Sequence, residues 1–178
     1  SGEDHAFRFD ASNTAAHQET QMGMHHDGIH YFRLPDMPGT AGLLELAAYF
    51  AGQPKAKRGI LFLAFSAEEL GLIGSGYYVN NPTLPLDKCA VMINMDMIGR
   101  IKDGKVFVGG TGTGDSLLPA IEAAKPKHQL NLDLSEQGGY GSSDHFSFAL
   151  KQMPVLFFFS GLHSDYHKPS DTWEKIDQ

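Results

Sequence analysis

Carboxylate and imidazole side chains follow three apolar stretches of this sequence, close to the point where each stretch ends. Glu68 and Glu69 come after the first stretch and Asp96 after the second, while His167 lies a few residues beyond the third. Carboxylates and imidazoles without cysteine form a donor set that suits zinc or a similar metal ion. These residue types indicate a metal site, provided that the fold brings the three ends together.

The competing interpretation of each end is an ordinary polar loop, in which a glutamate simply favours the start of the next helix. Against it stands the clustering of histidines, since five of the nine fall in two groups. These five are His25, His26, His30, His163 and His167. Adjacent side chains such as Glu68 and Glu69 diverge at a strand end. One can bind metal while the other acts as a general base toward activated water.

Other catalytic patterns are weaker. The sequence has no G-x-S-x-G nucleophile elbow and no H-E-x-x-H motif. The glycine-rich run 109–114 lacks the lysine of a phosphate-binding loop. The segment 142–145 contains serine, aspartate and histidine, but residues so close in sequence rarely form a catalytic triad.

The three apolar stretches span residues 59–65, 89–94 and 154–159, and their composition predicts strands buried on both faces. Helices are predicted at 40–51, 70–79, 116–124 and 143–150, and shorter strands at 105–108 and 129–134. This alternation predicts the α/β fold class, as a three-layer αβα sandwich with a mostly parallel, mixed central sheet. In such sheets ligands bind beyond the carboxyl ends of the strands, where the candidate residues lie.

The chain has 178 residues and a formal net charge of −7, which fits one domain over residues 1–178. The acidic balance argues against nucleic acid as a partner, whereas it tolerates a metal cation or a peptide amino terminus. No apolar run approaches the roughly 20 residues of a membrane span, and the first residues do not resemble a signal peptide. The single cysteine, Cys89, is predicted to be a buried, unreactive thiol.

Five segments follow one another along the chain as a recognisable series of motifs. They read GTAGLLELA (39–47), FSAEELGLIGS (65–75), INMDMIGR (93–100), GSSDHF (141–146) and DYHKPSDT (165–172). In these segments the chain resembles the two-zinc aminopeptidases of the bacterial leucyl aminopeptidase type, whose relatives include glutaminyl cyclases. The resemblance covers most of residues 23–178. It implies a zinc-exopeptidase-like fold with a shortened or atypical amino-terminal part.

The resemblance also implies a role for each matching residue. His25 and Asp96 would bind one zinc ion, and Glu69 and His167 would bind the other. Glu68 would be the general base that takes a proton from zinc-activated water.

Four further residues would support this site. Asp27 would orient His25, as partners of metal-bound histidines usually do. Asp144 and His145 would support the ligands or face the substrate, and Asp171 would support His167.

One segment departs from the family pattern. The family carries G-A-D-D-N-A-S-G, in which the first aspartate bridges both metal ions. Here Leu34 occupies that position, and leucine cannot bind zinc, so Asp36 is the alternative ligand. A bridging carboxylate offsets the repulsion between two nearby dications. Its loss favours weaker binding of a zinc pair, or binding of one zinc ion only.

The implied reaction is removal of the amino-terminal residue from a peptide that has a free amino terminus. The family is often exported, which implies a secreted or periplasmic location. No pattern assigns an oligomeric state. Two alternatives remain open. The altered segment 32–38 could mark an inactive scaffold of the same fold, or the chain could perform acyl transfer with a single zinc, as a glutaminyl cyclase does.

Overall fold

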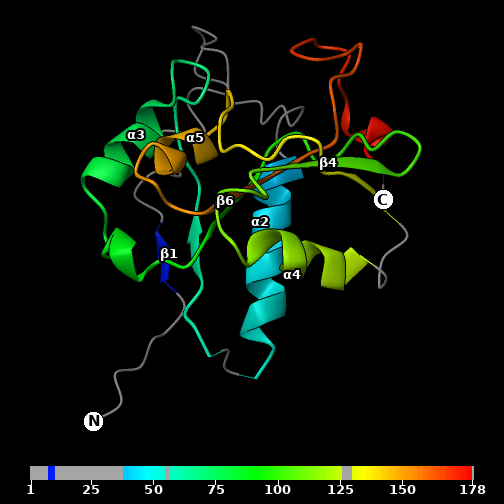
Figure 1. Cartoon of the computed structure of the whole chain (residues 1–178). Coiled ribbons are helices and arrows are strands. Elements are labelled where there is room, and N and C mark those ends of the chain that lie inside the picture. The colour runs from blue at the N-terminus through cyan, green and yellow to red at the C-terminus, as the bar shows by residue number, and fades with distance from the viewer. Residues whose placement is uncertain (1–7, 11–37, 55–56, 126–129, 178) are drawn as a thin grey trace, which may run out of the picture.

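A four-stranded sheet forms the centre of the computed structural model, which describes residues 8–10, 38–54, 57–125 and 130–177 (Figure 1). The strands, in their order across the sheet, are β3 (Met92–Met95), β6 (Val155–Phe159), β4 (Lys105–Gly109) and β5 (Asn131–Asp133). β3 runs parallel to β6 and β4 runs parallel to β5, whereas β4 and β6 are antiparallel. The sheet is therefore mixed, as the sequence predicts.

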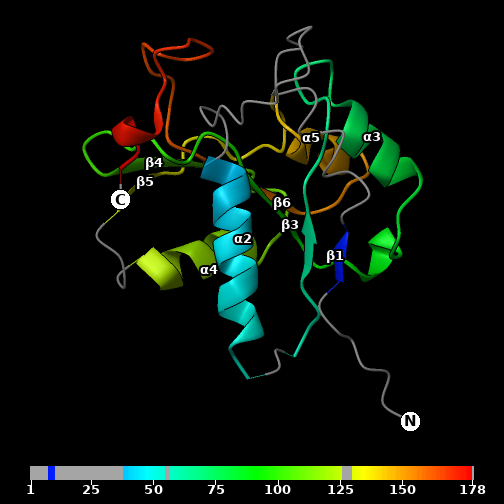
Figure 2. The same ribbon diagram turned by 180° about the vertical axis from the view of Figure 1, so that it is seen from behind.

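Helices cover both faces of this sheet. They are α2 (Pro38–Ala51), α3 (Ile73–Asn80), α4 (Leu117–Ala124) and α5 (His145–Ala149). Both views show α3 and α5 together on one side of the sheet, with α2 and α4 on the other (Figures 1 and 2).

Side chains alternate along β6 to match these two layers, as strand geometry requires. Val155 is buried in a cluster with Phe148 of α5, while the next residue, Leu156, is buried in a cluster with Leu117 of α4. The two apolar cores on opposite faces of the sheet confirm the predicted three-layer arrangement.

The first predicted strand is shorter than expected and lies outside this sheet. β2 (Leu61–Leu63) pairs in parallel with β1 (Arg8–Asp10) as a separate two-stranded sheet. Leu61 and Leu63 pack against the core cluster that contains Val155, so apolar contact joins β2 to the rest of the molecule. The sequence did not predict β1, because residues 1–22 are polar and lack a convincing apolar period.

Two burial predictions are wrong. Ile93 of β3 is 55% exposed, so this strand is not buried on both faces. Cys89 is also exposed, because the strand begins only at Met92 and Cys89 follows the short 3-10 helix η2 (Leu86–Lys88). A second 3-10 helix, η4 (Trp173–Lys175), lies near the end of the described chain. Within the described ranges, every helix is too short or too polar to cross a membrane.

Candidate metal site

Glu68 and Glu69 lie on a tight turn between β2 and α3. The carbonyl of Glu68 accepts hydrogen bonds from the backbone amides of Gly71 and Leu72, at 3.0 and 2.9 Å. Gly71 has a φ of +101°, a conformation that glycine adopts without strain. This turn replaces the first part of the helix predicted at 70–79, so that α3 starts only at Ile73.

Gly74 brings α3 directly against the segment that follows β2. A Cβ atom at this position would lie only 2.5 Å from the carbonyl oxygen of Ser66 and 2.7 Å from its amide nitrogen. The amide of Gly74 also donates a 3.0 Å hydrogen bond to the Ser66 carbonyl. Close packing of backbone on backbone therefore holds the turn that carries the two glutamates.

Asp96 directly follows β3, at the same edge of the sheet as the end of β6. Its backbone amide donates a 3.2 Å hydrogen bond to the carbonyl of Phe158 in β6. The amide of Ser160, the first residue after β6, donates a 3.2 Å bond to the carbonyl of Met97. Backbone hydrogen bonds thus join the two loops directly after the strands that they follow.

His167 reaches Glu69 from the loop that follows β6. The imidazole Nε2 lies 2.8 Å from Glu69 Oε1, and the two side chains are 42% and 53% exposed. The structure thus brings together two residues that the sequence predicts as ligands of the same zinc ion.

The donor atoms of this pair fit a zinc ion. Around a tetrahedral zinc with ligand bonds of about 2.0–2.2 Å, neighbouring donors lie roughly 3.3 Å apart. Their separation of 2.8 Å would need to widen only slightly. Both side chains also reach solvent, so the pair can adjust and an ion has access.

Asp144 is a buried carboxylate beside Asp96. Its pKa is raised to about 6, chiefly by burial and also by the negative charge of Asp96, while a hydrogen bond with Ser75 acts in the opposite direction. Its Oδ1 atom has no hydrogen-bond partner among the described residues, and the residue is 8% exposed. A cation near these two carboxylates would relieve both the repulsion and the loss of hydration.

His145 is packed into the core rather than toward a substrate. It is 1% exposed and stacks on Phe157 with ring centroids 4.3 Å apart. Its Nδ1 lies 3.4 Å from the side-chain nitrogen of Asn94, which also donates a 2.7 Å bond to Ser143. Burial lowers the pKa of His145 to about 4, so the ring is neutral at pH 7. His145 thus lies against Asn94, two residues before Asp96, which favours the predicted supporting role over contact with the substrate.

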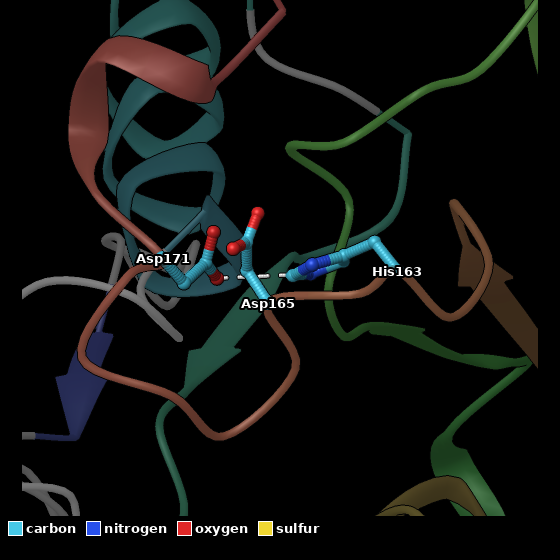
Figure 3. A group of neighbouring side chains, drawn as sticks. All are labelled: His163, Asp165 and Asp171. Atoms are coloured by element: carbon cyan, nitrogen blue, oxygen red, sulfur yellow. Dashed lines mark ion pairs between the residues drawn. The ribbon is translucent and has the colours of Figure 1, made fainter.

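Asp171 lies in a cluster with His163 and Asp165, whose potential ligand atoms are all within 4.8 Å of one another. Figure 3 shows the three side chains converging. His163 Nε2 lies 3.6 Å from Asp171 Oδ2. Two cations already neutralise the carboxylates, because Arg100 pairs with both and Lys175 lies 2.9 Å from Asp165. We therefore interpret the cluster as an ion-pair network rather than a second metal site.

Sequence reasoning missed this network. Arg100 lies in the motif at 93–100, but nothing in the sequence links it to Asp165 and Asp171, which are 65 and 71 residues away. The remaining predicted residues, His25, Asp27 and Asp36, lie outside the described residues.

Comparisons with known proteins identify the family of the chain. Residues 36–178 match peptidase family M28. The chain is 38% identical over 143 residues to leupeptin-inactivating enzyme 1 of Streptomyces exfoliatus, covering 77% of this chain and 30% of that protein. A solved zinc aminopeptidase from Bacillus subtilis superposes with a TM-score of 0.65 at 30% identity, over 78% of this chain and 36% of that one.

A glutaminyl cyclase from Porphyromonas gingivalis shares the fold, with a TM-score of 0.60 at 22% identity, over 76% of this chain and 54% of that one. The chain spans about a third of the length of the curated relatives that it matches.

Proposed function

The chain belongs to peptidase family M28, and we propose that it carries the metal site of a zinc-dependent aminopeptidase. The observation that supports this most strongly is the contact between Glu69 and His167, two zinc-type donors from loops that are nearly a hundred residues apart in sequence. Family membership indicates the class of reaction, and the Glu69–His167 pair indicates where the zinc ion would bind.

In this proposal Glu69 and His167 would hold one zinc ion. Asp96 and His25 would hold the other, with Asp36 as the alternative to the missing aspartate. Zinc, when bound, polarises a carbonyl group and lowers the pKa of water. All other steps fall to side chains of the protein.

Glu68 is the proposed general base. It occupies the same turn as Glu69 and is less exposed than its neighbour. Adjacent side chains diverge, so in this proposal Glu68 faces the substrate while Glu69 faces the ion. As the base it accepts a proton from the attacking water and then delivers this proton to the departing amine. The acidic balance of the chain, with a formal net charge of −7, is compatible with the positively charged free amino terminus of a peptide.

Hydrolysis of leucine amide by the purified chain, with and without added zinc, tests the proposal. We expect zinc to bind in stoichiometric amount and hydrolysis to depend on it. A chain that binds no zinc and releases no leucine contradicts the proposal. Zinc binding without turnover identifies the inactive scaffold instead.

Product analysis with a peptide that begins with glutamine separates hydrolysis from acyl transfer. A hydrolase releases free glutamine, whereas a glutaminyl cyclase leaves a cyclised amino terminus and releases ammonia.

The proposal includes a single domain with an atypical amino-terminal part. It also includes a secreted or periplasmic location, which cell fractionation of the natural host would check.

A further inference from the structure

Arg100 joins two aspartates that lie on either side of His167 in the sequence. We call residues 160–171 the His167 loop. The guanidinium NH2 lies 3.1 Å from Asp165 Oδ2, and NH1 makes a close contact with Asp171 Oδ1. Asp165 lies two residues before His167 and Asp171 four residues after it. One side chain therefore closes a short span of the loop around the proposed ligand.

The network around Arg100 is largely shielded from water. The Arg100, Asp165 and Asp171 side chains are only 20%, 15% and 6% exposed. Asp165 also accepts a 2.7 Å hydrogen bond from Ser170 and pairs with Lys175 at 2.9 Å. Shielded, charge-assisted bonds in a planar fork hold geometry much better than exposed ion pairs do.

The loop needs such restraint because His167 adopts an unusual backbone conformation. Its φ is +54°, in the left-handed region that residues other than glycine rarely occupy. Such a conformation persists only when the surrounding structure enforces it. In this conformation the ring of His167 meets Glu69 at 2.8 Å.

Arg100 also connects the His167 loop to the loop that carries Asp96. It lies four residues after Asp96, and its backbone amide donates a 3.3 Å hydrogen bond to the hydroxyl of Ser160. The same hydroxyl bonds the carbonyl of Met97. The segments that carry one proposed ligand of each zinc ion are thus held against each other at this point.

We propose that Arg100 is a positioning residue, which sets the His167 ligand against Glu69 by clamping Asp165 and Asp171. This role rests on the proposed zinc site, and it differs from binding the ion directly. It also gives Asp171 a function, because the described contacts of its side chain are with Arg100 and His163.

The experiment compares the intact chain with the variants Arg100→Lys and Arg100→Gln. Zinc affinity is measured by competition with a fluorescent chelator, and amide hydrogen exchange of the His167 loop is measured in the presence of EDTA. We expect Arg100→Gln to weaken zinc binding by about 10–100-fold, as loss of a partner that orients a ligand typically does. Arg100→Lys should recover part of this loss, since it keeps the charge without the fork.

Hydrogen exchange tests the clamping of the His167 loop separately from zinc binding. In Arg100→Gln the amides of the loop should exchange at least about tenfold faster, whether or not zinc binds. Lys105→Gln is the matched control, because Lys105 pairs with Asp133 at 2.9 Å outside this network and is 42% exposed. Asp165→Asn serves as the second variant if Arg100→Gln fails to fold.

Equal zinc affinity and equal exchange in the intact chain and in folded variants would overturn the role of Arg100. Failure of the intact chain to bind zinc would instead contradict the proposed function. The exchange of the metal-free loop would still decide whether Arg100 clamps it.

Discussion

The candidate site has an exposed half and a buried half, which present different problems to the protein. In the exposed half, Glu69 and His167 are roughly half accessible to solvent and contact each other directly. In the buried half, Asp144 is 8% exposed and interacts with the charge of Asp96, and its neighbour in sequence, His145, is 1% exposed. Exposed carboxylate and imidazole groups can replace bound water with a metal ion at a small cost in free energy. Buried carboxylates near each other destabilise the metal-free fold.

The two halves should therefore respond to mutation in different ways. Changes in the exposed half should affect chemistry and metal binding more than folding. Changes in the buried half should affect folding first, and in a pH-dependent manner.

The largest effect is expected for Glu68→Gln in the exposed half. Loss of a general base typically lowers the rate by about 10²–10⁴-fold, and glutamine keeps the shape of the side chain. We expect kcat to fall by this factor while zinc content and the free energy of unfolding change little. Steady-state kinetics with leucine amide measure the effect. Glu122→Gln, at an exposed residue of α4, is the control. Unchanged kcat in Glu68→Gln would remove Glu68 from its assigned role.

The next largest effect is expected for Asp144→Asn in the buried half. The pKa of Asp144 is raised from 3.8 to about 6 in the folded chain. The fold therefore favours the protonated form, and its stability falls as pH rises from about 4 through about 6. The full penalty is present above pH 6 and is at most about 3 kcal/mol.

Urea unfolding in EDTA at pH 4 and pH 7.5 checks this prediction. Asp144→Asn should be more stable than the original chain at pH 7.5 and nearly equal to it at pH 4. Asp87→Asn, which changes an exposed carboxylate, should show no such pattern. A variant that is less stable at pH 7.5 would mean that the carboxylate is satisfied in the folded chain.

A smaller effect is expected at the backbone contact that supports the exposed half. Gly74→Ala places a methyl group about 2.5 Å from the Ser66 carbonyl, and neither backbone can easily move. Overpacking of this kind costs about 1–3 kcal/mol. We expect the melting temperature to fall and zinc affinity to weaken with it.

Gly76→Ala is the internal control in the same helix, because its Cβ would meet nothing within 4 Å. That substitution should be neutral or stabilising by up to about 1 kcal/mol, through higher helix propensity. Equal stability of the two alanine variants would show that α3 is not held against Ser66 as described.

The strands of the central sheet could be predicted from sequence where the apolar signal was strong. The stretch 154–159 became β6, and its alternating side chains formed two cores, because a central strand is surrounded on both faces. The stretch 89–94 was less reliable. Apolar composition alone does not reveal that Ile93 is exposed or that Cys89 lies before the strand.

The candidate site could be predicted only as residue types at strand ends. The turn at Glu68–Glu69 and the positive φ of His167 depend on local packing, which carries no periodic signal. The pairing of Arg100 with Asp165 and Asp171 is a tertiary contact between distant segments. Family resemblance pointed to the motif that contains Arg100, but only the fold connects this residue to the loop around His167.

The central claim is that Glu69 and His167 together hold a zinc ion, and the zinc content of the single variant His167→Gln tests it most directly. Metal analysis after equilibration with zinc and removal of the excess should give one zinc fewer than in the intact chain. Glu69→Gln should lose the same ion. Equal zinc content in the intact chain and in both variants would contradict the account, because the pair would then not form the site.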